Sequence, residues 1–201
     1  MHPNEGDTME QKRCGWVKLS EPIYILYHDN EWGKELYDDR AIFELFSLET
    51  QSAGLSWLTV LKKRDAYRKA FDNFDLYKVA AYTSQDVERI LLCANIIKNK
   101  PKVEAIIQNA KGFLGIIQEY GSIHDYFWQK IEYKVICNSV EDYKSAKTTS
   151  ELSDAICKEL KKRGFKFIGS ITIYAFMQAC GMIDDHENSC FCKNSTNLSH
   201  D

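Results

Sequence analysis

The stretch KVEAIIQNAKGFLGII, residues 102–117, decides the fold class. Its apolar residues recur three or four positions apart, at Val103, Ile106, Ile107, Ala110, Leu114 and Ile117. This spacing places them on one face of a long amphipathic helix. Similar helical runs cover residues 41–48, 53–61, 84–94, 155–160 and 172–180, and only 133–137 has a weak strand pattern. We therefore predict an all-α protein with six to eight helices.

The composition is that of one packed domain. The chain has 201 residues, of which 44% are hydrophobic and 12% aromatic, and this is enough to form a core. No stretch approaches the roughly 20 apolar residues that cross a bilayer. We predict a flexible leader over residues 1–11, one domain over 12–192 and a polar tail over 193–201.

Seven scattered cysteines indicate free thiols and metal ligands more than a disulfide framework. The polar start of the chain does not resemble a secretory signal. We expect a cytoplasmic protein, monomeric and without a nucleotide cofactor. A net charge of −3 argues against a protein that coats nucleic acid nonspecifically, although local clusters of lysine and arginine permit a phosphate-binding stripe.

Two pairs of metal-ligand residues lie at opposite ends of the sequence: Cys14 with His28, and His186 with Cys190. The spacing of the second pair places both side chains in one helical turn or tight loop. Four such ligands would form a closed, structural zinc site. Cys14 and His28 are far apart for a zinc finger, and Cys192 could replace Cys190, so spacing alone leaves the metal undecided.

Aromatic and polar residues are interleaved near the N-terminus, in YILYHDNEWG at residues 24–33. Such a mixture suits a pocket that stacks a flat ring, although each aromatic could also be a core residue. Glu49 ends an apolar helix, where a buried carboxylate would need a partner. The candidate pocket residues are Trp16, Tyr24, Tyr27, Trp32, Glu49 and Trp57.

A helical hairpin is predicted where helix 84–94 meets helix 102–117. Asn95 tolerates the left-handed conformation that ends a helix, and Pro101 is favoured at a helix start. A tip of this kind can hold a phosphate by charge and by backbone N–H groups. An ordinary helix connection explains the same residues equally well. The polar residues of the tip are Lys98, Asn99, Lys100 and Lys102.

Five motifs closely resemble those of the DNA-3-methyladenine glycosylase I family. They are RCGW at 13–16, YHDNEWG at 27–33, AGLSWLTVLKKR at 53–64, LKKRGFKF at 160–167, and FMQACG at 176–181 followed by Asp185 and His186. The resemblance extends from about residue 12 to residue 192. It implies a helix-hairpin-helix glycosylase fold with a structural zinc clasp joining the two ends, bound by Cys14, His28, His186 and Cys190.

The same resemblance implies a base pocket formed by Tyr27, Glu49 and Trp57, with Trp16, Tyr24 and Trp32 around it. It places DNA-backbone contacts at the 95–102 turn. Asn95 and Pro101 replace the family's usual glycines in this turn, and these changes put the strength of DNA binding in question. Leu55 is the candidate wedge that fills the gap left by a flipped base.

The implied activity is hydrolysis of the N-glycosidic bond of 3-methyladenine in alkylated double-stranded DNA, which leaves an abasic site. Glu49, the principal acid, would accept hydrogen bonds from the adenine amino edge and favour a cationic base, and Trp57 would stack on the ring. Whether Glu49 also acts as a general base stays open. No lysine is placed to form a Schiff base, which indicates a monofunctional enzyme.

Two other functions compete with this interpretation. A non-catalytic, zinc-stabilised helical module could bind DNA or sense lesions, although it would not need the complete set of Tyr27, Glu49 and Trp57. A zinc-dependent hydrolase would need three protein ligands and an open position on the metal.

Overall fold

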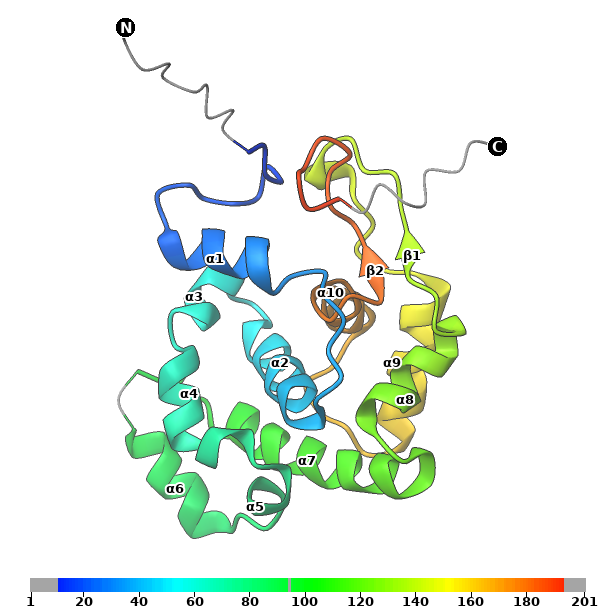
Figure 1. Cartoon of the computed structure of the whole chain (residues 1–201). Helices are drawn as coiled ribbons and strands as arrows, with labels where there is room; N and C mark the ends of the chain where they lie inside the picture. Colours follow the sequence, from blue (N-terminus) through cyan, green and yellow to red (C-terminus); the bar gives the residue numbers. More distant parts are fainter. Residues whose placement is uncertain (1–10, 94, 194–201) are drawn as a thin grey trace, which may run out of the picture.

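The computed structural model describes residues 11–93 and 95–193, so most of the predicted leader and tail lies outside the described residues (Figure 1). These ranges are mainly helical and contain one pair of very short strands. The α-helices are α1 Pro22–Asn30, α2 Asp39–Ser52, α3 Trp57–Leu61, α4 Arg64–Ala70, α5 Leu76–Ala80, α6 Ser84–Leu92, α7 Lys100–Tyr120, α8 Ile123–Trp128, α9 Glu151–Lys162 and α10 Ser170–Ala179. The 3-10 helices are η1 Asp72–Phe74, η2 Gln129–Ile131 and η3 Tyr143–Ser145, and the strands are β1 Ile136–Cys137 and β2 Ile183–Asp184.

Helix α2 lies at the centre of the molecule, packed against α7, α8 and α10 (Figure 1). It begins where the Asp38 side chain accepts hydrogen bonds from the Arg40 and Ala41 N–H groups. Every residue from 42 to 51 is buried, including the polar ones. Phe46 of this helix contacts four other phenylalanine rings: Phe113, Phe127, Phe165 and Phe176. This aromatic cluster fixes the position of α2 and of the side chains that it carries.

The described residues contain ten α-helices, so the prediction of six to eight was too low. The additional helices are short, and several have fewer than eight residues, too few to give a periodic apolar pattern. The predicted helix over 53–61 is wrong in its first four residues, because α3 begins only at Trp57. Gly54 has a φ of +78°, and this left-handed residue separates α3 from α2.

The predicted hairpin between α6 and α7 is present. Asn95 has a φ of +67°, which confirms the expected left-handed residue. Helix α7 begins at Lys100, two residues before the predicted start, because Asn99 caps it by accepting a hydrogen bond from the Lys102 N–H at 3.1 Å. Helix α6 ends at Leu92, and Ala94 lies outside the described residues.

Strands β1 and β2 pair in parallel, with Ile136 opposite Ile183 and Cys137 opposite Asp184. The predicted strand at 133–137 is therefore confirmed only for its last two residues. Gly181 precedes β2 with a φ of +84°, and an added Cβ would lie 2.6 Å from the backbone of Lys34 and Glu35. The chain leaving α10 thus passes directly against the loop that follows α1. None of the described helices is long and apolar enough to cross a membrane.

Candidate active site and metal cluster

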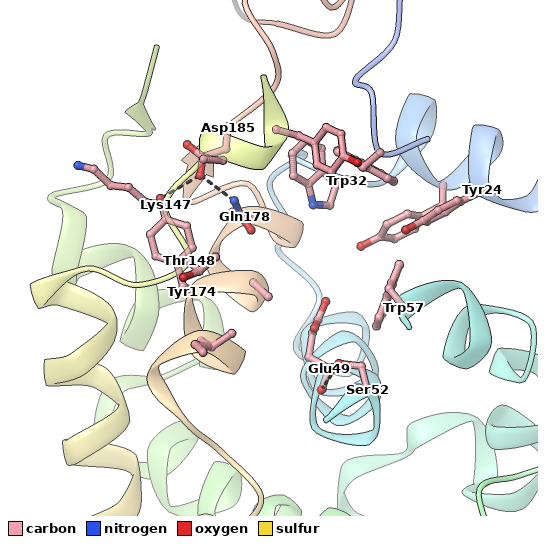
Figure 2. Close-up of a pocket in the computed structure, with 16 residues that line it drawn as sticks. Tyr24, Trp32, Glu49, Ser52, Trp57, Lys147, Thr148, Tyr174, Gln178 and Asp185 are labelled. Atoms are coloured by element: carbon pink, nitrogen blue, oxygen red, sulfur yellow. Dashed lines mark hydrogen bonds between the residues drawn. The ribbon is translucent and has the colours of Figure 1, made fainter. Parts of the chain in front are cut away.

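A cavity of about 330 Å³ lies between two walls of the helical body (Figure 2). One wall comes from α1, α2 and α3 with the segment before α1, and the other comes from α10 and residues 143–148. The structure brings all six predicted pocket residues to this cavity: Trp16, Tyr24, Tyr27, Trp32, Glu49 and Trp57. The opposite wall includes Tyr143, Lys147, Thr148, Tyr174, Gln178 and Asp185.

Glu49 projects from α2 between the aromatic wall and the α10 wall (Figure 2). Its side chain is almost completely buried, and no cationic side chain within the described ranges forms an ion pair with it. Burial raises the pKa of Glu49 from 4.5 to about 8, because the charged carboxylate loses hydration. The carboxyl group is therefore mostly protonated near neutral pH, and a cation in the cavity would favour its ionised form.

The aromatic wall forms two groups of rings. Tyr27 and Trp57 lie 5.3 Å apart between ring centroids, and Trp16 lies 5.0 Å from Tyr24 and 5.1 Å from Trp32. Burial, followed by the nearby Glu49 carboxyl, raises the pKa of Tyr27 well above its usual value, so its hydroxyl keeps its proton. These rings offer flat apolar surface beside a titratable carboxyl group, an arrangement suited to a planar, positively charged ligand.

The opposite wall is polar, and sequence reasoning did not identify it. The buried Asp185 carboxylate accepts hydrogen bonds from the Tyr174 hydroxyl at 2.9 Å and the Gln178 amide at 2.7 Å (Figure 2). The Asn138 amide donates a third, at 2.6 Å. Asp185 and Gln178 both lie in motifs quoted above, but only this structure shows that they face Glu49 across one cavity.

A cluster of metal-ligand residues lies beside the cavity. One potential ligand atom from each of His28, His186, Cys190 and Cys192 lies within 4.8 Å of the other three. Asp29 holds the His28 Nδ1 at 2.7 Å, and Asp184 holds the His186 Nδ1 at 2.9 Å. Carboxylates commonly orient metal-binding imidazoles in this way. The His186 Nε2 atom is buried without a hydrogen-bond partner among the described residues, so the donors fit a zinc ion.

Cys14 lies at the edge of this cluster, as a fifth candidate ligand. Its Sγ accepts a hydrogen bond from the Glu187 N–H at 3.3 Å, and it packs against Cys190. Hydrogen bonds with Cys14 and with His28 outweigh burial and lower the pKa of the Cys190 thiol. The sequence suggests Cys192 as a replacement for Cys190, whereas the structure places both thiols in the cluster.

Two tryptophans connect the cluster of potential metal ligands to the cavity. The Trp32 ring lies 4.5 Å from the His186 ring and also lines the cavity. The Trp16 ring lies 5.2 Å from the His28 ring and lines the cavity as well. The cluster therefore supports the aromatic wall directly.

The predicted DNA-binding residues of the α6–α7 turn divide into two groups. Lys98, Asn99 and Lys100 are exposed. Lys102 is buried, and its Nζ donates to the Gln51 carbonyl at 2.9 Å and the Ala53 carbonyl at 2.8 Å. These are carbonyls at the C-terminal end of α2, which a cation stabilises. A phosphate contact by Lys102 is thus a wrong prediction, because its ammonium group already serves the core.

Leu55, the predicted wedge, lies in the turn between α2 and α3, with 44% of its surface exposed.

A second basic turn lies between α9 and α10, where Lys161, Lys162 and Lys166 are exposed. Gly169 precedes α10 as its N-cap and has no side chain to cap it, which leaves the first N–H groups of that helix available. Ile171, in the same helical turn, lines the cavity. These lysines belong to the LKKRGFKF motif at 160–167, whose sequence alone does not show how near it lies to the cavity.

The family model described as methyladenine glycosylase matches residues 16–193. The DNA-3-methyladenine glycosylase of Haemophilus influenzae is 48% identical over 91% of this chain and 98% of its own. DNA-3-methyladenine glycosylase 1 of Escherichia coli is 46% identical over 90% of this chain and 96% of its own. A solved tyrosine-to-phenylalanine variant of 3-methyladenine DNA glycosylase I, in complex with 3-methyladenine, has a TM-score of 0.87 and 40% identity. The match covers 90% of this chain and 97% of that one.

Proposed function

The chain belongs to the methyladenine glycosylase family, and we propose that it is a DNA repair enzyme that removes 3-methyladenine from alkylated DNA. The similarity to named glycosylases covers nearly the whole chain. The observation that carries the proposal is the cavity in which Glu49 lies beside the rings of Tyr27 and Trp57. A DNA-binding module without catalysis would have no need to maintain this costly buried carboxyl group.

The chemistry follows from the charge of the lesion. Methylation at N3 gives the purine a positive charge within DNA and weakens its glycosidic bond. When that bond breaks, its electron pair passes to the purine, which leaves as a neutral base. Water then adds to C1′ of the sugar and releases a proton, giving an abasic site. Little acid catalysis is needed, so the enzyme can act mainly by selecting and holding the cationic base.

We assign this selection to Glu49, Tyr27 and Trp57. A base flipped out of the duplex would enter between the two walls. Glu49 would accept hydrogen bonds from the amino edge and lose its proton as the cation enters, because opposite charges favour the ionised carboxylate. The Trp57 ring would add a cation–π attraction of about 0.5–2 kcal/mol. Unmethylated adenine is neutral and would gain neither charge interaction.

We propose that a zinc ion joins the two ends of the chain through His28, His186 and Cys190, with Cys14 as the fourth ligand. Cys192 is the alternative fourth ligand. Four protein ligands leave no open position, so the metal would supply stability and no chemical step. Metal analysis of the purified protein tests this, with Cys14→Ser and Cys192→Ser compared for zinc content.

We expect DNA to approach along the two basic turns. The α6–α7 turn offers Lys98, Asn99 and Lys100, and the α9–α10 turn offers three exposed lysines with the open N-terminus of α10. Replacing Lys161 and Lys162 together by alanine should weaken DNA binding and reduce its salt dependence. The same measurement on a Lys98→Ala, Lys100→Ala variant compares the two turns. We assign the wedge between base pairs to Leu55.

Base release from alkylated DNA tests the function. The wild-type protein should release 3-methyladenine, detected by chromatography of the free bases, while Glu49→Gln should release it far more slowly with unchanged circular dichroism. Glu88→Gln, at an exposed carboxylate on α6, is the matched control. Wild-type protein that binds the DNA and releases no base would instead support the non-catalytic module.

The proposed enzyme is a cytoplasmic monomer without a nucleotide cofactor. The described residues contain no disulfide, as is usual for proteins of a reducing compartment. Sedimentation of the purified protein, with and without DNA, measures the oligomeric state.

A further inference from the structure

The segment of residues 138–148 is held by the C-terminal loop. The Asn188 N–H donates to the Val140 carbonyl at 2.7 Å, and the Val140 N–H donates to the Asn188 side chain at 3.0 Å. The Asn188 amide also donates to Glu141 at 2.7 Å, and the Lys193 ammonium donates to the Asn138 carbonyl at 2.6 Å. Residues 143–148 of this segment form part of the cavity wall.

Glu187 is the point where this loop contacts both the metal cluster and the cavity wall. Its backbone N–H donates to the Cys14 Sγ at 3.3 Å. Its side-chain Oε1 accepts a hydrogen bond from the backbone N–H of Tyr143 at 2.9 Å. Tyr143 is the first cavity-lining residue of the segment and begins η3. Glu187 is buried, with 7% of its surface exposed, so this contact is shielded from solvent.

Gly15 closes this junction from the N-terminal side. An added Cβ at Gly15 would lie 3.1 Å from the Tyr143 ring and 3.2 Å from the Glu187 Oε1. The residue next to Cys14 thus packs directly on both partners. One compact junction therefore contains parts of the N-terminal segment, the cavity wall and the C-terminal loop.

We propose that Glu187 is a positioning residue that makes the shape of the base cavity depend on assembly of the metal cluster. The Glu187 backbone is fixed where the cluster forms, and its carboxylate then holds Tyr143 and the wall that follows. The inference rests on the proposed base site. It assigns Glu187 no contact with the base.

Glu187→Ala separates the two contacts, because the variant keeps the backbone N–H that reaches Cys14 and lacks the carboxylate that holds Tyr143. In zinc-loaded Glu187→Ala, the Tyr143 amide should exchange its hydrogen faster by NMR, while the Val140 amide stays protected. The affinity for free 3-methyladenine should fall about tenfold, with zinc content unchanged. Glu187→Gln should restore both, because its amide oxygen can accept the same hydrogen bond.

The matched control is Glu141→Ala, which removes a neighbouring carboxylate that contacts Asn188 and not Tyr143. The affinity of this variant for the base should equal that of wild type.

In wild-type protein, chelation of zinc should speed hydrogen exchange at the Tyr143 amide and weaken base binding. In Glu187→Ala, chelation should change neither quantity further. Tight base binding by zinc-loaded Glu187→Ala, or failure of Glu187→Gln to rescue, overturns the proposal. Failure of the base site itself would appear separately, as wild-type protein that does not bind 3-methyladenine.

Discussion

Replacement of Glu49 by glutamine should make the protein more stable at alkaline pH. Burial raises the pKa of the Glu49 carboxyl from 4.5 to about 8, so the folded protein retains a proton that the unfolded chain has lost between those values. The free energy of unfolding must therefore fall as the pH rises through this window. Glutamine has nearly the same shape and does not ionise, so the variant lacks this decrease.

The magnitude follows from the two pKa values. Each pKa unit corresponds to about 1.4 kcal/mol, so a rise from 4.5 to about 8 gives an upper limit of about 5 kcal/mol above pH 8. Glu49 lines a cavity that admits water, and hydration of the carboxylate reduces the penalty. We expect Glu49→Gln to exceed wild type by about 2–4 kcal/mol at pH 9 and to differ little at pH 5.

Urea denaturation of both proteins at pH 5, 7 and 9 measures this difference. Comparison at each pH cancels the titration of all groups that the two proteins share. A difference in unfolding free energy that does not change from pH 5 to pH 9 would refute the reasoning, because it would mean that Glu49 ionises as freely in the folded protein as in water. The same variant should be impaired in base release, so stability and activity should change in opposite directions.

The remaining predictions concern the supports of the site. Lys102→Met should lower the free energy of unfolding by about 1–3 kcal/mol in urea denaturation, because two α2 carbonyls lose their donor; an unchanged value would contradict the assigned role. Gly181→Ala should cost more than about 1 kcal/mol in the same assay, because the position is left-handed and closely packed. Chelation of zinc should lower the melting temperature, and added zinc should restore it; a melting curve unaffected by chelator would argue against the metal.

Much of the site was predictable because its residues are unusual for their surroundings. A glutamate at the end of an apolar helix and a group of tryptophans among polar residues indicate a pocket. The structure confirms that Tyr27, Glu49 and Trp57 line the same cavity. The long helix around Val103 was equally clear, because its apolar positions repeat over several turns.

The errors have physical causes. Lysine prefers the surface, so the burial of Lys102 could not be read from a lysine-rich turn; it depends on the α2 carbonyls, about fifty residues earlier in the chain. Short helices such as α5 and α8 have too few turns to show a period. The polar wall with Asp185 and Gln178 depends on how the chain leaves α10, and a strand of two residues gives almost no pattern.

The burial of α2 on every side limits how this enzyme could be redesigned for other damaged bases. Apart from Glu49 and Ser52, which face the cavity, a changed side chain on α2 would have to be accommodated by the packed core, and stability would fall before selectivity improved. Residues 143–148 face the same cavity from the outside of the molecule, where Lys147 and Thr148 are solvent-accessible. Libraries that seek a new lesion range should therefore vary this outer segment and leave the central helix unchanged.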